Sequence, residues 1–358
     1  MYPTSESPDL TPEQCVALDD TLFGSNPASY WRARIDQLLR APAPVDYTMG
    51  LAAEVLELGL DPRMLALTEP GQDERELQRA LDAFALRQHL AEALVRLVHA
   101  VITAAGAPRS SVWALLTSNR DDGAALVKAL RSYQEDGGIS ATLFMPPDEV
   151  RSMADNPPDE VLPAVRMHWL WVQRAMQLLV TEGLDANAGN NKIKHGLAVR
   201  PRNDLRVSFL TRAPNPDGTI PVSAFDGAID IIDATSVEFL ERLGNRHSHA
   251  GSWEITTLNL RAAPLLGEAL VLSTVWASVF ASAAANHFAG RGRSVPKHPG
   301  LVLGPKPDAF VRKAVGYRQG LTTPTGGGVP RDLTVETGQG VVGLTVTGPG
   351  ASAVIVDG

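Results

Sequence analysis

The chain has 358 residues, of which 44% are hydrophobic, 20% charged and 6% aromatic, and its formal net charge is −8. The apolar fraction is too high for an intrinsically disordered chain. A single cysteine, Cys15, excludes an internal disulfide and a cysteine-based zinc site, and the acidic total excludes a protein coated in basic charge for nucleic acid.

The N-terminal third predicts helices. Residues 1–12 are polar and lack the apolar core of a signal peptide, so we expect a cytoplasmic protein. The strongest pattern has apolar residues at steps of three and four with acidic residues at its start, and Gly106 and Pro108 end it. The helices expected in this part are 27–40, 47–59, 73–105, 110–117 and 121–134.

The middle of the chain predicts a change from helix to strand. A loop at 146–159 precedes a second long apolar helix at 159–183, and a short helix continues to His195. Two Val-rich and Leu-rich runs, 197–200 and 205–210, flank a polar turn and predict a β-hairpin near 197–210.

Three further segments complete the core of the chain. Thr235 and Glu238 form a capping-box pattern that predicts a helix over 235–243, and 253–260 predicts a strand or an extended link. An apolar helix is expected at 264–288. No charged residue occurs over the 22 residues 269–290, a length that could span a bilayer, but the serines and alanines there favour a helix buried in a protein core, and we expect no membrane contact.

The C-terminal tail has a different character. Residues 290–330 are rich in Gly and Pro, and 331–358 hold three short Val/Thr runs split by Gly. We therefore predict a mainly α protein: a multi-helix bundle with an inserted β-hairpin and a small C-terminal β-appendage. The expected division is an N-terminal helical segment 1–72, a helical core 73–290 and a tail 291–358.

The charges are segregated along the chain. Residues 1–86 carry 15 acidic and 6 basic side chains, whereas 192–212 have a net charge of +5 and 286–318 a net charge of +6. Two basic segments in an acidic chain indicate an anionic partner, with phosphate as the leading candidate. The alternative is that these segments lie on acidic N-terminal helices of the same chain or of a neighbouring subunit.

The first candidate site is the run from Asn190 to Gly196, which ends a helix before the basic hairpin. Lys192 and Lys194 could bind phosphate while His195 moves a proton, because imidazole titrates near neutral pH. Alternatively, these residues have no chemical role and simply complement the dipole at the C-terminus of the helix. The phosphate-binding residues that we expect are Lys192, Lys194, Arg200, Arg202, Arg206 and Arg246.

The second candidate site is the polar turn from Arg242 to His249. Arg242 could neutralise a scissile phosphate while His247 takes the proton of a ribose 2′-hydroxyl, a reaction that needs no metal. His247 and His249 could instead bind a metal ion, but no further ligand has suitable spacing, so we expect no metal site. A polar loop without chemistry is the other alternative.

Helices followed by Arg242-x4-His247 resemble the HEPN domains, helical nucleotide- and RNA-binding modules of toxins and antiviral systems. The string Asn191-Lys192-Ile193-Lys194-His195-Gly196 also looks like one from bacterial helical proteins of this kind. The resemblance covers roughly residues 73–290. It implies a homodimer in which two Arg/His pairs face one cleft.

The sequence therefore leads to two main hypotheses, with a sensor of a small anion or nucleotide as a third. The first is an RNA-binding protein of toxin or defence type, with metal-independent ribonuclease activity as its catalytic version, no cofactor, and Arg242, His247 and His195 as catalytic residues. The second is a non-enzymatic helical scaffold or regulator that assembles through its C-terminal β-segment. In either case we expect a homo-oligomer.

Overall fold

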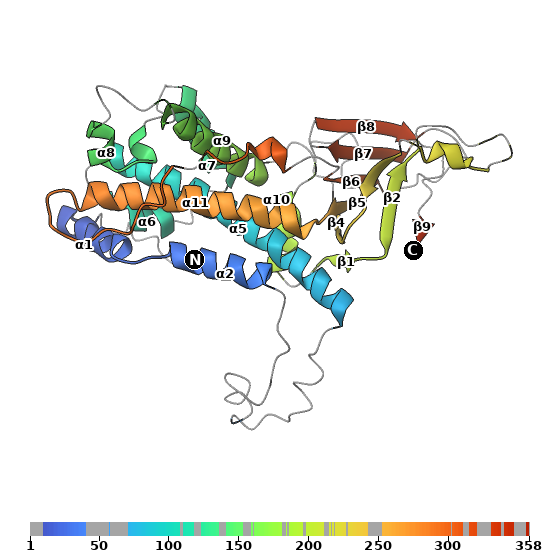
Figure 1. The fold of residues 1–358 in the computed structure, drawn as a ribbon, viewed down its shortest axis with the longest axis horizontal. Helices are drawn as coiled ribbons and strands as arrows, with labels where there is room; N and C mark the ends of the chain where they lie inside the picture. Colours follow the sequence, from blue (N-terminus) through green and yellow to red (C-terminus); the bar gives the residue numbers. More distant parts are fainter. Residues whose placement is uncertain are drawn as a thin grey trace, which may run out of the picture. The chain divides into compact units, whose positions relative to one another are not determined.

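A computed structural model describes most of the chain. The residues described are 10–40, 57, 71–107, 110–117, 123–135, 141–152, 159, 161–180, 184, 186–195, 198–210, 215, 217, 219–226, 228–242, 253–301, 303–310, 315–320, 331–337, 340–346 and 356–357. The expected helix at 47–59 lies outside these residues, apart from Glu57. The structure confirms a mainly α chain with an added β element (Figure 1).

The chain forms two compact units. The helical unit comprises Met1–Ala33, Ala85–Gly196 and Ala263–Arg312, and the sheet unit comprises Arg34–Phe84, Leu197–Ala262 and Lys313–Gly358. Each unit therefore combines three separate stretches of sequence. The division expected from the sequence, at 72/73 and 290/291, stays a prediction.

The helices follow the sequence pattern closely. Their bounds are α1 (Pro12–Phe23), α2 (Ala28–Leu39), α5 (Gln72–Gly106), α6 (Val112–Thr117), α7 (Gly123–Glu135), α8 (Pro147–Ser152), α9 (Val161–Leu179), α10 (Ala186–Lys194) and α11 (Ala262–His287), with 3-10 turns at Ala141–Leu143, Val222–Ala224 and Pro307–Ala309. Helix α1 was not expected, and α8 lies within the segment 146–159 that was expected to be a loop. Helix α1 begins with a complete capping box, because Thr11 accepts a hydrogen bond from the Gln14 backbone and the Gln14 side chain accepts one from Thr11.

The core of the helical unit is built on α5, α9 and α11. Helix α11 buries sixteen of its residues, which confirms the expected core helix at 264–288. On α11 the rings of Trp276 and Phe280 stack at 5.1 Å, and Phe23 of α1 packs against Phe280 at 5.3 Å. By length and composition, α5 and α11 could each cross a membrane, but 78% of the apolar window of α11 is buried within the protein.

The strands of the sheet unit form two antiparallel sheets. They are β1 (Arg200–Arg202), β2 (Leu205–Phe209), β3 (Ile229–Ile232), β4 (Ser236–Arg242), β5 (Trp253–Asn259), β6 (Gly316–Gly320), β7 (Arg331–Thr337), β8 (Gly340–Val346) and β9 (Val356–Asp357). The larger sheet has the order β1-β4-β5-β6-β7-β8, and the smaller one has the order β3-β2-β9. The C-terminal strands β7 and β8 are thus part of the larger sheet.

Two sequence-based expectations about this unit were wrong. The helix expected at 235–243 is strand β4, which pairs with β5 along its whole length, from Ser236 opposite Asn259 to Arg242 opposite Trp253. Seven cross-strand pairs outweigh the weak local preference for helix. The run 205–210 forms β2, but β1 begins at Arg200 and includes Pro201 and Arg202, which were expected in the turn. The two strands do not pair as a hairpin, because β1 pairs with β4 and β2 pairs with β3 and β9.

Candidate functional site

The predicted basic residues lie in both units, and most of those described contact an acceptor of the protein. In the helical unit, Lys194 of α10 lies 3.4 Å from Glu92, and His195 is exposed directly after the helix. In the sheet unit, Arg202 donates to both oxygens of Asp204 at 2.8 and 2.9 Å. The Asp204 bonds raise the pKa of Arg202, and the same bonds lower the pKa of Asp204 to about 2.

The neighbouring arginines follow the same pattern. Glu238 lies 3.7 Å from the exposed Arg200 and 3.4 Å from Arg202. Arg206 donates to the backbone oxygens of Asn203 and Leu205. The basic segment 192–212 is therefore partly neutralised within the protein, and its role as a phosphate site stays a prediction.

The second predicted site is mostly outside the described residues. Arg246, His247 and His249 are not described, and of Arg242 only the backbone is, at the end of strand β4. The roles of Arg242 and His247 therefore stay predictions. Among the residues that the structure describes, no group of three or more His, Cys, Asp or Glu side chains could hold a metal ion.

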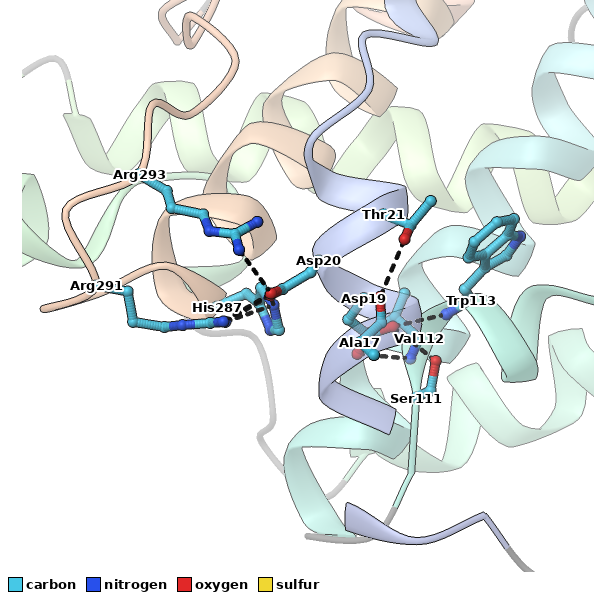
Figure 2. Close-up of polar contacts among 10 residues, drawn as sticks. All are labelled: Ala17, Asp19, Asp20, Thr21, Ser111, Val112, Trp113, His287, Arg291 and Arg293. Carbon is cyan, nitrogen blue, oxygen red and sulfur yellow. Dashed lines mark hydrogen bonds and ion pairs between the residues drawn. The ribbon is translucent and has the colours of Figure 1, made fainter. Parts of the chain in front are cut away.

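A different cluster stands out in the helical unit, and we call it the Asp20 cluster: Asp20, His287, Arg291 and Arg293. Asp20 lies on α1, His287 is the last residue of α11, and Arg291 and Arg293 follow in the segment after this helix (Figure 2). Arg291 is bidentate, with its Nη1 and Nη2 at 2.6 and 2.7 Å from the Asp20 oxygens. Arg293 Nη2 lies 3.3 Å from Asp20 Oδ2.

Local backbone geometry brings both arginines to one carboxylate. They alternate with glycines in the run Gly290-Arg291-Gly292-Arg293, and Gly290 and Gly292 have φ angles of 71° and 64°. This left-handed region is easily adopted only by glycine. Both guanidinium groups also lie over the Phe288 ring, at 5.5 and 5.7 Å from its centroid, where the ring attracts cations.

His287 completes the cluster. Its Nε2 lies 2.7 Å from Asp20 Oδ1, and its ring packs between Phe23 and Phe288, at 5.4 and 4.8 Å. The same Nε2 also lies 3.0 Å from Arg291 Nη1, so the imidazole contacts both the carboxylate and one guanidinium group of the cluster. Hydrogen bonds from Arg291 and then from His287 lower the pKa of Asp20 to about 2, so the carboxylate is ionised at neutral pH.

The residue before Asp20 has a structural role. The Asp19 carboxylate accepts hydrogen bonds from Ser111 Oγ at 2.7 Å and from the Trp113 and Val112 backbone at 3.1 and 3.2 Å (Figure 2). It thereby satisfies backbone donors at the start of α6. Asp19 therefore contacts the start of α6, and the next residue, Asp20, contacts the basic segment that follows α11.

The Asp20 cluster borders an open depression on α1. The depression has a volume of about 340 Å³ and is lined by Pro12, Glu13, Val16, Ala17 and Asp20. Hydrogen bonds from its own backbone and from the Thr11 side chain lower the pKa of Glu13, so this carboxylate is also ionised.

The sequence analysis did not identify Asp20 or His287 as site residues. It did single out the basic segment 286–318, and the alternative that such a segment lies on an acidic N-terminal helix is confirmed for Arg291 and Arg293. The capping box at Thr11 and the Gly-Arg-Gly-Arg run were usable local signals. In comparisons with protein-family models, curated proteins and solved structures, nothing matched this chain.

Proposed function

We propose that the protein binds RNA, and that Arg291 and Arg293 contact its phosphates. The observation that carries this proposal is that two arginines share a single carboxylate. The cluster pairs one carboxylate with two guanidinium groups, so it retains a net positive charge. The side chains of Arg291 and Arg293 are 34% and 55% exposed, which makes this charge accessible to a ligand.

The hydrogen-bonding capacity of the cluster supports the same proposal. A guanidinium group has five N–H donors. Arg291 uses its two terminal nitrogens on Asp20, and Arg293 uses Nη2 alone. The other donors can bind a phosphate, while the planar guanidinium faces can stack on unpaired bases. Single-stranded RNA presents both groups.

The test is binding of a fluorescently labelled single-stranded RNA, followed by anisotropy at several salt concentrations. We expect each of Arg291→Ala and Arg293→Ala to weaken binding about tenfold, because a hydrogen bond to a charged group contributes about 1.5–3 kcal/mol. Each lost phosphate contact should also reduce the slope of log K against log salt by about 0.7.

The matched control is Arg40→Ala, which removes an exposed arginine paired with Asp36 on α2. Equal affinity of the wild type, Arg293→Ala and Arg40→Ala would exclude the proposed site, and absence of RNA binding by the wild type would exclude the function. Arg293→Glu provides a second variant, because Arg293 lies beyond the end of α11 and its side chain is 55% exposed.

The catalytic version of the proposal is metal-independent RNA cleavage by Arg242 and His247, with His195 as a further candidate. Its test is incubation of labelled RNA with the protein in EDTA. We expect cleavage by the wild type and its loss in Arg242→Ala and His247→Ala. RNA that stays intact with the wild type would leave a binding protein without this activity. Equal cleavage by all three proteins would exclude Arg242 and His247 as the catalytic residues.

A second candidate function is assembly through the C-terminal β-segment, favoured by the position of β8. This strand lies at the end of the larger sheet, and its seven residues, GVVGLTV, carry no charge. An uncharged edge strand can pair with another chain. Thr345→Lys tests this, because the new cation lies opposite Asp332 and should be tolerated within the sheet.

Light scattering should then report a homo-oligomer for the wild type and a smaller species for Thr345→Lys. An unchanged mass would exclude assembly through β8. The homodimer and the cytoplasmic location remain part of the proposal.

A further inference from the structure

The depression on α1 and the Asp20 cluster share a residue. Asp20 lines the depression, and its carboxylate lies within 2.6–3.3 Å of nitrogen atoms of Arg291 and Arg293. A ligand with a phosphate on these arginines would therefore have the depression directly beside it.

The lining residues form one stripe along α1. Glu13, Val16, Ala17 and Asp20 follow the three- and four-residue steps of a single helix face. Glu13 and Asp20 are two turns apart, which corresponds to about 10 Å along the helix axis. One nucleotide covers such a span from its phosphate to the outer edge of its base.

The chemistry changes along this stripe. Pro12, Val16 and Ala17 offer apolar surface for the flat face of a base, and the Val16 side chain is exposed. At the far end from the arginines lies the ionised Glu13 carboxylate, which accepts from its own backbone N–H and from the Thr11 side chain and keeps further lone pairs for a ligand donor. The site thus has cations at one end, an apolar floor, and an acceptor at the other end.

We propose that this depression binds the base of a nucleotide whose phosphate lies on Arg291 and Arg293, and that Glu13 selects guanine. The inference rests on the proposed RNA binding and adds a base preference to it. Guanine has two adjacent donors, N1–H and the N2 amino group, which fit the two oxygens of a carboxylate. Adenine, cytosine and uracil each place an acceptor beside a donor, and that acceptor would face the Glu13 charge.

The test compares four labelled pentanucleotides, UUGUU, UUAUU, UUCUU and UUUUU, by anisotropy with the full chain. We expect UUGUU to bind about tenfold more tightly than the other three, the effect of a good bidentate base contact. Glu13→Gln should abolish this preference and favour UUAUU, because an amide offers one donor and one acceptor, as adenine does.

Two further variants complete the test, the first as a control and the second as a probe of the apolar floor. Glu74→Gln changes an exposed carboxylate in the first turn of another helix, α5, and should keep the guanine preference. Val16→Asp places a charge on the apolar floor and should weaken binding of all four pentanucleotides.

The outcomes separate the two proposals. Equal affinity for the four pentanucleotides, with binding still sensitive to Arg291→Ala, would overturn the guanine inference and leave RNA binding in place. A guanine preference that survives Glu13→Gln would also overturn it. Absence of binding to any pentanucleotide would overturn both proposals.

Discussion

Glu268 holds two arginines in the core of the helical unit. Its carboxylate on α11 accepts from Arg87 Nη1 of α5 at 3.0 Å and from Arg174 Nε of α9 at 2.9 Å. The side chain of Glu268 is 3% exposed, and those of Arg87 and Arg174 are 10% and 18% exposed. Three core helices therefore meet at one buried charge.

We predict that Glu268→Gln lowers the free energy of unfolding by about 3–5 kcal/mol, because it leaves two guanidinium groups in the core without their carboxylate. Urea denaturation followed by circular dichroism measures this. The control is Glu92→Gln, whose side chain is 34% exposed beside Arg96 and Lys194, and which should cost less than about 1 kcal/mol. Similar losses in both variants would contradict the prediction.

His168 is a second buried titratable residue. It is 1% exposed on α9, with Nδ1 at 3.0 Å from the Ala164 carbonyl oxygen and Nε2 at 3.4 Å from Ser278 Oγ. Burial lowers the pKa of His168 below the ordinary value of a histidine side chain, about 6.5. The folded protein therefore holds this imidazole neutral at pH values where the unfolded chain binds a proton.

We predict that stability falls as the pH drops below about 6.5, with a slope from His168 of at most about 1.4 kcal/mol per pH unit. The sign follows because only the unfolded chain gains the proton in this range. Urea denaturation between pH 7.5 and 5 should show this slope in the wild type and in His195→Gln, whose histidine is exposed, but not in His168→Gln. An equal slope in all three proteins would refute it.

At the scale of elements, α11 is packed closely against the segment that follows it. A Cβ atom added at Gly267 would lie 2.5 Å from Phe310 Cε1, and the Phe310 ring packs edge-on against Trp171 of α9 at 5.6 Å. The Trp171 indole also donates to the Pro305 carbonyl oxygen at 3.1 Å. The absence of a side chain at position 267 thus allows Phe310 to approach both helices.

We predict that Gly267→Ala destabilises the protein by about 1–3 kcal/mol, because the clash with Phe310 outweighs the better helix propensity of alanine. Thermal unfolding of Gly267→Ala, Phe310→Ala and the double variant measures the coupling between the two positions. In the Phe310→Ala background the Gly267→Ala change should cost nothing. Gly106→Ala, with no atom within 4 Å of the new Cβ, is the control.

The strands show where local pattern and tertiary context disagree. In 235–243, Thr235 and Glu238 have capping-box spacing. However, the backbone carbonyl of Thr235 accepts from the Leu260 N–H, and the Glu238 side chain pairs with Arg202. Both residues are used by partners distant in sequence. Pro201 lies in β1, at an edge of the larger sheet, where a missing N–H is tolerated. Local spacing could not reveal these pairings.

At the scale of the whole molecule, the last strands complete a sheet that begins near residue 200. Strand β6 pairs with β5 on one side and with β7 on the other. The sheet unit therefore depends on residues from both the middle and the end of the chain.

We predict that a chain ending at Gly320 loses protection of its β6 amides from hydrogen exchange, because β6 then becomes an edge strand. Mass spectrometry of peptides from β6 and from α9 provides the measurement and its internal control. The α9 amides should stay protected by the core around Trp171 and Val172. Unchanged exchange in β6 would contradict the pairing with β7.

The sequence by itself determined the long helices. The periodicity, acidic start and glycine end of α5, and the long apolar runs of α9 and α11, are local properties, so these three helices could be predicted nearly to their bounds. The Val/Thr runs of β7 and β8 also predicted strands. The basic character of 286–318 was visible from the charge count alone.

Only the tertiary structure decided which strands pair and which charges meet. His287 and Asp20 are 267 positions apart, and Arg87 and Glu268 are 181 apart. No local pattern specifies contacts at such separations, because they form only when buried apolar faces bring distant segments together. For that reason the sequence could predict a basic segment, whereas the carboxylate beneath it and the depression beside it depended on the fold.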